Sequence, residues 1–383
     1  MDFAKRMQEI TSFRAVDLSN LAQEKRAKGF DVISMGIGEP DFTAPLSVVE
    51  ALDKAAREGK SAYSEAAGIP ELREAIAQYY NEHFHTHITS KQVIVTSGAS
   101  AALAMTSLCF INPGDEILMP DPSYPPNMSF IRCAGGIPKQ IPTTIEGRFQ
   151  LTAQDIEANW SERTRGVLLA SPGNPTGTSI EYEELKRIVQ VVKKRGGLLI
   201  MDEIYLGLYY AQKPKSVLSI DDDVVVINSF SKYFNMTGWR LGWIVLPEQH
   251  VKEFEKLSSN FAICASSLAQ RAALACFEPD TIKIYEDRRL KFKERLDYLV
   301  PALEALDIHV PVVPDGAFYI YADVSRYTED SFKFAYELLD KANIVWVPGL
   351  DFGPTWAKKM VRISYATALD RLQEAMYRLE KIL

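Results

Sequence analysis

A lysine and an aspartate that follow apolar runs are the residues best suited to chemistry. Lys232 closes the sequence Ser-Phe-Ser-Lys, directly after the run 223–228. A lysine at the end of a buried strand loses hydration, which lowers its pKa and frees an amine nucleophile, although most lysines are solvated surface groups. Asp202 ends the apolar run 198–201. A carboxylate there needs a partner, such as a protonated pyridine nitrogen, a helix start or an ion pair.

A second group of residues has the chemistry of a phosphate site. Arg240 follows Lys232 closely in the chain, and Ser229 and Ser231 flank the same segment. The turn 97–100 precedes an expected helix, whose free amides bind anions, and an arginine adds a two-pronged cation. This turn lacks the lysine and the spacing of a Walker A loop, so a nucleoside triphosphate is not indicated.

The segments that carry these residues alternate in type. Short apolar runs predict strands at 93–96, 116–119, 166–170, 198–201, 223–228 and 241–246, with helices at 101–108 and about 182–195 between them. Strands of this kind belong to a mostly parallel sheet that is buried on both faces. Polar clusters follow the strands at 97–100, 171–177, 202–205 and 228–232. Because ligands bind at the carboxyl ends of such strands, we expect the clusters to meet at one sheet edge.

The C-terminal third has a different pattern and predicts a separate α+β unit that begins near 275–285. A long charged helix is expected over 281–306, with core positions at Ile284, Leu290, Leu296, Leu299 and Leu303. Short strands are expected at 317–322 and 344–347, and helices near 330–343 and 370–382.

Composition narrows the function classes. A chain of 383 residues predicts two to three domains. Its net charge of −7 lacks the basic footprint of a nucleic-acid binder. The N-terminus has no apolar core of a signal peptide, and no run is long enough to span a membrane. The four cysteines form no CxxC pair, which favours a cytoplasmic protein with free thiols.

Taken together, the motifs resemble those of the class I/II aminotransferases, pyridoxal-phosphate enzymes of fold type I. The four central motifs are 174–177 (Asn-Pro-Thr-Gly), 202–205 (Asp-Glu-Ile-Tyr), 229–232 (Ser-Phe-Ser-Lys) and 238–242 (Gly-Trp-Arg-Leu-Gly). The match extends to 35–42, 68–73 and 361–364, which is essentially the whole chain. The resemblance implies a large cofactor-binding domain at 41–280, with a mostly parallel sheet between helices. A smaller α+β domain would combine 1–40 with 281–383.

The resemblance also implies roles for individual residues around pyridoxal phosphate. Lys232 would bind the cofactor as a Schiff base and then move the substrate proton, and Asp202 would pair with the ring nitrogen. The ring would be held by Asn174 and Tyr205 at its phenolic oxygen and by Tyr124 on its face. The phosphate would be held by Ala99, Ser100, Ser229, Ser231 and Arg240. Asp121–Pro122 and Asn174–Pro175 match peptide bonds that are often cis in the family.

For the substrate, the resemblance implies that Arg362 binds the α-carboxylate with help from Asn174 and Gly38. Tyr63 matches a tyrosine that reaches the phosphate of the other subunit, so a homodimer is expected. The reaction would be ping-pong: an amino acid leaves as an oxo acid, and a second 2-oxo acid then receives the amino group.

The amino donor is less firmly indicated. Acidic donors need a second cation, yet Ser100 stands where some aspartate enzymes have a lysine, and the stretch 257–270 has no Lys or Arg. This favours a neutral or aromatic donor with 2-oxoglutarate or pyruvate as acceptor. Four cations near the N-terminus are not placed by the sequence: Arg14, Lys25, Arg26 and Lys28.

Other readings remain open. The chain could be an aspartate aminotransferase, a C–S β-lyase or a decarboxylating or racemising relative. A cofactor-binding regulator module would need a DNA-binding domain, for which the space before residue 35 is too short. His83, His85 and His87 alternate as metal ligands can, but no second ligand cluster is evident. We expect a polar loop or helix end there and no metal site.

Overall fold

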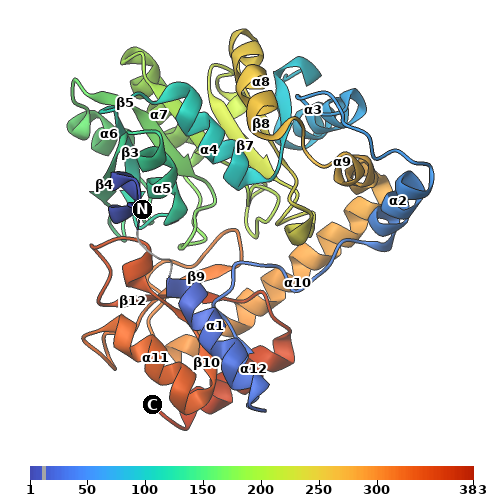
Figure 1. Ribbon diagram of the computed structural model, residues 1–383. Coiled ribbons are helices and arrows are strands. Elements are labelled where there is room, and N and C mark those ends of the chain that lie inside the picture. The colour runs from blue at the N-terminus through green and yellow to red at the C-terminus, as the bar shows by residue number, and fades with distance from the viewer. Residues whose placement is uncertain (11–13) are drawn as a thin grey trace.

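A seven-stranded sheet forms the centre of the larger lobe in the computed structural model, which describes residues 1–10 and 14–383 (Figure 1). Its order is β2-β8-β7-β6-β5-β3-β4. The strands are β2 (Val93–Thr96), β3 (Glu116–Asp121), β4 (Ile137–Pro142), β5 (Thr164–Ala170), β6 (Leu198–Asp202), β7 (Val225–Ser229) and β8 (Gly242–Val245). The strands from β4 to β7 are parallel, and β8 is antiparallel to β7 and β2. The mostly parallel sheet of the α/β prediction is confirmed.

Helices cover both faces of this sheet. They are α2 (Leu46–Arg57), α3 (Pro70–Phe84), α4 (Ala99–Phe110), α5 (Pro126–Cys133), α6 (Ala153–Asn159), α7 (Tyr182–Lys194), α8 (Glu248–Ala262) and α9 (Ser267–Ala273). Neighbouring strand residues enter opposite core clusters: Leu168 and Ile200 pack on one face, and Val167 and Leu199 pack on the other. This two-sided burial explains why the strands read as continuous apolar runs.

Helix α7 forms where its sequence pattern predicts it. Leu185, Ile188, Val189 and Val192 are buried at helical spacing, while acidic residues occupy the first turn and lysines the last. This distribution of charge opposes the helix dipole at both ends. The helix connects the carboxyl end of β5 to the start of β6, and the two strands run parallel.

Two features of the sheet differ from the sequence prediction. Strand β4 was not predicted, because it carries Pro138 and Pro142 and is only partly buried. A proline is tolerated in an edge strand, where one side needs no hydrogen bonds, and β4 is the edge beside β3. Strand β3 also continues through Pro120 to Asp121, two residues beyond the predicted end.

The smaller lobe combines the N-terminal segment with the C-terminal third (Figure 1). Its helices are α1 (Arg14–Ala27), α10 (Pro279–Glu304), α11 (Ser331–Ala342) and α12 (Leu369–Glu380). A three-stranded antiparallel sheet has the order β11 (Val347–Pro348), β12 (Met360–Ser364), β9 (Tyr319–Asp323). A separate parallel pair joins β1 (Ile33–Ser34) to β10 (Ile344–Val345). The predicted strand 344–347 is thus two short strands with different partners.

Helix α10 corrects two of the predicted core positions. Ile284 is 38% exposed and Leu290 is 54% exposed, whereas Leu296, Leu299 and Leu303 are buried as predicted. The buried stripe starts instead at Thr281, Tyr285 and Phe292. These positions follow the 3.6-residue period back from Leu296, and Ile284 and Leu290 lie off that stripe.

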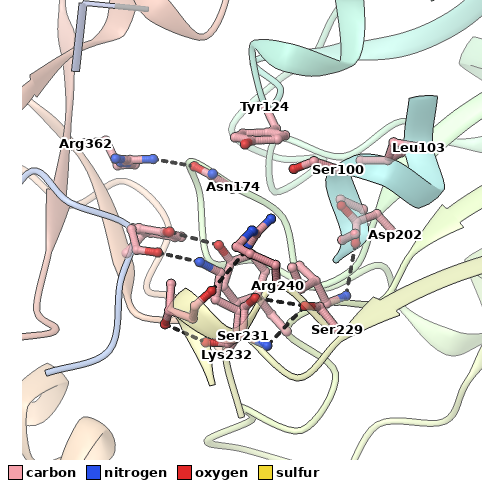
Figure 2. A pocket seen from close by; sticks show the side chains of 17 residues that line it. Ser100, Leu103, Tyr124, Asn174, Asp202, Ser229, Ser231, Lys232, Arg240 and Arg362 are labelled. Atoms are coloured by element: carbon pink, nitrogen blue, oxygen red, sulfur yellow. Dashed lines mark hydrogen bonds between the residues drawn. The ribbon is translucent and has the colours of Figure 1, made fainter. Parts of the chain in front are cut away.

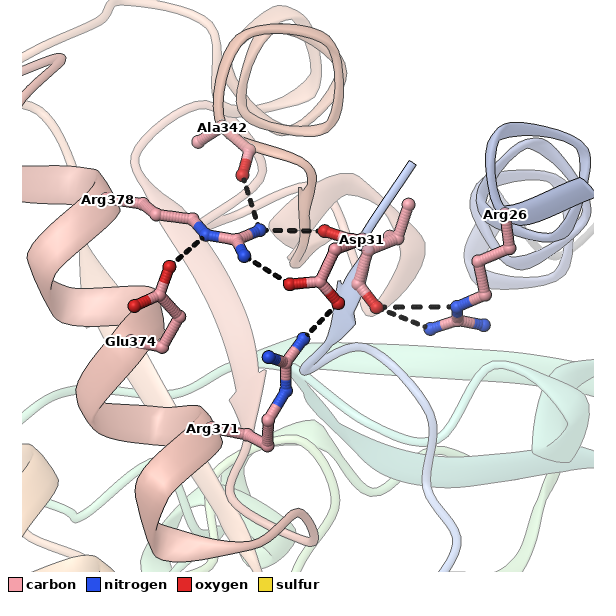
Figure 3. Close-up of polar contacts among 7 residues, drawn as sticks. Arg26, Asp31, Ala342, Arg371, Glu374 and Arg378 are labelled. Atoms are coloured by element: carbon pink, nitrogen blue, oxygen red, sulfur yellow. Dashed lines mark hydrogen bonds and ion pairs between the residues drawn. The ribbon is translucent and has the colours of Figure 1, made fainter. Parts of the chain in front are cut away.

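An ion-pair cluster ties the N-terminal segment to α12 (Figure 3). The Asp31 carboxylate accepts hydrogen bonds from Arg371 and Arg378, and Arg378 also donates to Glu374. Arg371 and then Arg378 lower the pKa of Asp31 below its usual value. Arg26 of α1 donates to the carbonyl oxygen of Val32, just before β1. The start of the chain is therefore held against its C-terminal helix.

Candidate active site

A cavity of about 250 Å³ opens at the carboxyl ends of the parallel strands, between the two lobes (Figure 2). It is lined by every residue predicted for the site except Tyr63: Gly38, Ala99, Ser100, Tyr124, Asn174, Asp202, Tyr205, Ser229, Ser231, Lys232, Arg240 and Arg362. The polar clusters that follow the strands therefore do meet at one sheet edge.

One end of the cavity is suited to an anion. Helix α4 begins at Ala99, so its first amides have no partner within the helix. Ser229 donates to the Ser231 hydroxyl at 2.9 Å, and Arg240 is anchored by a 3.0 Å hydrogen bond to the Thr237 carbonyl oxygen. Gly98 has a φ of +87°, which favours glycine, and a Cβ atom there would lie 2.7 Å from Arg240 Nη2. Amides, hydroxyls and a guanidinium together form a phosphate-binding set.

Asp202 lies in the floor of the cavity with 6% of its surface exposed. Its Oδ1 accepts a 3.0 Å hydrogen bond from the Ile204 amide. Burial raises the pKa of Asp202 to about 6, although the Ile204 amide and the charge of Lys232 both lower it. A buried carboxylate of this kind favours a cationic hydrogen-bond donor, such as a protonated ring nitrogen.

Lys232 reaches into the same cavity and donates a hydrogen bond to the Gly38 carbonyl oxygen. Lys232 is half-buried because part of it faces the open cavity. Burial, with the charges of Arg362 and Arg240, lowers the pKa of Lys232 to about 8, while the charges of Glu39 and Asp202 act in the opposite direction. The amine is thus a better nucleophile near neutral pH than an ordinary lysine.

Arg362 occupies the opposite end of the cavity and is almost fully buried. Its Nη1 donates to Asn174 Oδ1 at 2.9 Å (Figure 2). Its Nη2 donates to the Gly36 carbonyl oxygen. Its Cζ lies 4.5 Å from the ring centre of Tyr319 and 5.0 Å from that of Phe352. A guanidinium held in this way can bind a carboxylate through two parallel hydrogen bonds.

Tyr63 is the one predicted site residue that lies elsewhere. Its side chain is 78% exposed and does not line the cavity. The preceding residue, Ala62, accepts a hydrogen bond from Ser267 at the start of α9. A single chain therefore does not bring Tyr63 to its own cavity.

The cavity also contains residues that the sequence did not identify: Leu103, Ala170, Ile204, Thr237 and Tyr319. Four are apolar or small residues of predicted helices, strands or loops, which carry no chemical signal. Tyr319 lies in an apolar run that predicts a core strand, and its hydroxyl is hydrogen-bonded to Tyr205 at 2.8 Å. The contact between Tyr319 and Tyr205 is visible only in three dimensions, because the two residues are far apart in the sequence.

The structure also places the other features noted in the sequence. Asp121–Pro122 and Asn174–Pro175 are both cis, as the resemblance implied, and so is Ser171–Pro172. The alternating histidines lie at the end of α3, where His83 packs on Tyr79. Residues 1–10 and 14–383 contain no group of three His, Cys, Asp or Glu placed to hold a metal. Over the same residues, no helix combines the length and apolar character needed to cross a membrane.

Comparison with known proteins agrees with this geometry. The family model of aminotransferase class I and II matches residues 31–379. A probable aspartate/prephenate aminotransferase of Aquifex aeolicus is 37% identical over 389 residues, covering 99% of this chain and 98% of that protein. A valine–pyruvate aminotransferase of Mycobacterium tuberculosis is 35% identical, covering 97% and 96%.

A solved structure shows the same fold. The aspartate aminotransferase of Thermus thermophilus with maleate superposes with a TM-score of 0.95 at 32% identity, covering all of both chains. The chain therefore belongs to the class I and II aminotransferases, whose members depend on pyridoxal phosphate.

Proposed function

We propose that this aminotransferase takes neutral or aromatic L-amino acids as donors and 2-oxoglutarate or pyruvate as acceptor. The supporting observation is the set of charges around the cavity. Among the described residues, its lining cations are Lys232, Arg240 and Arg362, and each has another role in the proposal. Near the start of α4 the cavity is lined by the uncharged residues Ser100 and Leu103. This favours a donor with an uncharged side chain over one with a side-chain carboxylate.

The unplaced cations of the N-terminal segment do not line this cavity. Arg14 lies 3.5 Å from the carboxylate of Asp351. Lys25 donates to the carbonyl oxygen of Leu339, and Arg26 donates to that of Val32. Lys28 also lies outside the lining. These contacts support a substrate pocket without a second carboxylate-binding cation from the same chain.

The residues present fit the cofactor, and we propose the following roles for them. When bound, pyridoxal phosphate supplies an electron sink that stabilises negative charge at the substrate α-carbon. The buried carboxylate of Asp202 holds the ring nitrogen, and Asn174 and Tyr205 bind the phenolic oxygen. Tyr124 covers the ring face. The phosphate is bound by Ala99, Ser100, Ser229, Ser231 and Arg240.

Lys232 would hold the cofactor through its amine, and the same amine would take the proton from the substrate α-carbon. Its lowered pKa makes it an effective base near neutral pH. Arg362, with Asn174 and the backbone near Gly38, orients the substrate α-carboxylate so that the α-proton faces this amine. The cycle is ping-pong because the first oxo acid must leave before the second enters the same site.

The lowered pKa of Lys232 predicts how the cofactor-free protein takes up pyridoxal phosphate. A protonated amine is unreactive, so the uptake rate should rise with pH and level off above about 8. Glu39→Gln removes a charge that raises this pKa, so its profile should shift to lower pH. Stopped-flow absorbance measures both profiles. A midpoint at the ordinary lysine value, about 10.4, would contradict the proposed environment of the amine.

The donor preference is tested by comparing kcat/KM for single amino acids with 2-oxoglutarate as acceptor. Phenylalanine or another uncharged donor should exceed aspartate, because no second cation compensates the aspartate side chain. A preference of more than about 100-fold for aspartate, equivalent to about 2.7 kcal/mol, would contradict the proposal. Aspartate is the second candidate, since the Aquifex and Thermus relatives carry that name. Pyruvate and ammonia formed from cysteine without an acceptor would instead indicate a β-lyase.

We further propose a homodimer in which Tyr63 reaches the cofactor phosphate of the partner subunit. In support, Tyr63 is exposed, and so are two apolar side chains, Leu46 and Phe261. Leu46 belongs to α2, which packs on α9, and Phe261 belongs to α8, which directly precedes α9 in the chain. Exposed apolar groups on neighbouring elements are typical of an interface between subunits. A cytoplasmic location remains a prediction from the sequence.

Mixed dimers test the shared site. Lys232→Ala should be inactive, and Tyr63→Ala should bind the cofactor about 10-fold more weakly through loss of one hydrogen bond to phosphate. A mixed dimer has one site with both native residues, so refolding the two variants together at low cofactor should restore about a quarter of wild-type activity. A monomer in sedimentation, or no recovery on mixing, would contradict the shared site.

The domain division is also proposed: residues 41–280 as the cofactor-binding domain, and 1–40 with 281–383 as the small domain. Supporting this, β1 pairs with β10, and the Asp31 cluster links the N-terminal segment to α12. Helix α10 begins at Pro279, close to the proposed boundary.

A further inference from the structure

Tyr319 lies among the residues that bind cofactor and substrate, although it is not one of the residues assigned to either. It is 1% exposed, begins β9 and lines the cavity. We propose that Tyr319 is a positioning residue that fixes the hydroxyl of Tyr205 and the guanidinium of Arg362 relative to each other. This inference rests on the roles proposed above for Tyr205 and Arg362.

The hydroxyl of Tyr319 sets the direction of the hydrogen bond at Tyr205. The two oxygens lie 2.8 Å apart, and either can be the donor. Tyr205 has a single hydroxyl proton. When Tyr205 donates that proton to the phenolic oxygen of the cofactor, Tyr319 must donate the proton between the two tyrosines. A hydroxyl that accepts one hydrogen bond is a stronger donor in the next, so Tyr319 strengthens the contact of Tyr205 with the cofactor.

The ring of Tyr319 supports Arg362 independently of the hydroxyl. The guanidinium carbon lies 4.5 Å from the ring centre, within the range of a cation–π contact. Phe352 provides a second aromatic contact at 5.0 Å. Tyr319 pairs with Ser364 in the register of β9 and β12, so ring and arginine extend from adjacent strands of one sheet. Hydrogen bonds to Asn174 and Gly36 complete the restraints on the guanidinium.

Gly38 shows how closely the Tyr319 hydroxyl is enclosed. A Cβ atom at Gly38 would lie 2.3 Å from Tyr319 Oη, so the backbone approaches the hydroxyl as only glycine allows. The carbonyl oxygen of Gly38 accepts the hydrogen bond from Lys232. One tyrosine therefore contacts Tyr205 and Arg362 and packs against the segment that contacts Lys232.

Tyr321 provides a matched control on the same strand. It is also 1% exposed, and its ring packs on Phe149 and Phe352. Unlike the hydroxyl of Tyr319, its buried hydroxyl has no hydrogen-bond partner among the described residues. Tyr321→Phe therefore removes a buried hydroxyl from β9 without removing a hydrogen bond seen in the structure.

The experiment compares cofactor-loaded wild type, Tyr319→Phe, Tyr319→Leu and Tyr321→Phe. The first readout is the pH midpoint of the visible absorbance, which follows a proton on the Lys232 nitrogen beside the phenolic oxygen. The second is the Kd of 3-phenylpropanoate, an unreactive carboxylate. Thermal melting of each variant, with and without cofactor, confirms that it folds.

We expect Tyr319→Phe to raise the pH midpoint by about 0.5 unit, because a weaker donor at Tyr205 stabilises the phenolic oxygen less. Its kcat should fall a few-fold, and the Kd of 3-phenylpropanoate should stay within about 2-fold, since the ring remains. Tyr319→Leu should raise that Kd about 5- to 10-fold as well, because the cation–π contact is lost. Tyr321→Phe should match wild type in both readouts.

Equal midpoints in Tyr319→Phe and Tyr321→Phe would overturn the inference, even if Tyr319→Leu failed to fold. An unchanged Kd in a folded Tyr319→Leu would overturn the part that concerns Arg362. Failure of the proposed function itself looks different, because wild type would then exchange no amino group with any neutral or aromatic amino acid.

Discussion

Lys232→Ala is expected to remove the visible absorbance of the cofactor-loaded enzyme and to reduce turnover at least about 10⁴-fold. In the roles proposed for Lys232, the variant would lose both the covalent anchor of the cofactor and the base that moves the substrate proton. Within the described chain no other lysine lines the cavity, so no neighbouring amine can replace it. Absorbance spectra and single-turnover rates with excess pyridoxal phosphate measure the two losses separately.

Two further variants test whether the loss of turnover is caused by the missing amine. Lys232→Arg keeps the positive charge but removes an amine that can lose its proton near pH 8, so it should be as inactive as the alanine variant. Lys256→Ala removes an exposed lysine of α8 that pairs with Glu253, and it should retain full activity. Ordinary turnover in Lys232→Ala would show that the central residue of the site is wrongly assigned.

Asp202→Asn is expected to reduce kcat by about 10²- to 10³-fold with little change in fold. Removing one partner of a buried charge pair costs about 3–5 kcal/mol, and a neutral amide cannot hold a proton on the ring nitrogen. The sign follows from the raised pKa of Asp202: burial disfavours the charged carboxylate, so a cationic partner stabilises it. A bound ring cation would lower that pKa again, so carboxylate and ring proton stabilise each other.

Glu203→Gln is the control for this prediction. Glu203 is also a buried carboxylate at the end of β6, but it accepts hydrogen bonds from Ser216 and the Val217 amide and does not line the active-site cavity. Loss of the Glu203 carboxylate should lower thermal stability, because it removes buried hydrogen bonds. The kcat of the folded variant should stay within about 3-fold of wild type, because Glu203 does not line the cavity. A kcat of Asp202→Asn close to that of wild type would contradict a pairing role for Asp202.

Much of the site could be predicted from the order of strands and polar clusters. Asn174, Asp202 and Lys232 each follow a buried strand, and parallel strands bring their carboxyl ends together whatever the details of packing. The same reasoning does not reach Tyr319, because a tyrosine inside an apolar strand has the pattern of a core residue. Its contact with Arg362 depends on the pairing of β9 with β12. Its hydrogen bond with Tyr205 joins the smaller lobe to the larger one.

Other parts of the fold could not be predicted for similar physical reasons. Strand β4 carries two prolines, which in a sequence predict the end of a strand. An edge strand tolerates them, because one of its sides makes no hydrogen bonds to another strand. Ile284 and Leu290 are apolar, yet they face solvent, because α10 buries only one stripe along its length. In the proposed homodimer Tyr63 acts at the partner's site, so the fold of one chain does not place it at a site.

The central claim is that this chain moves amino groups through a cofactor bound to Lys232 at the edge of the parallel sheet. The most direct test mixes the cofactor-loaded enzyme with L-phenylalanine in the absence of any oxo acid. We expect the visible absorbance to disappear as one phenylpyruvate forms per active site. Addition of 2-oxoglutarate or pyruvate should then restore the absorbance. No change in absorbance with any amino acid, or continued release of oxo acid and ammonia without an acceptor, would contradict it.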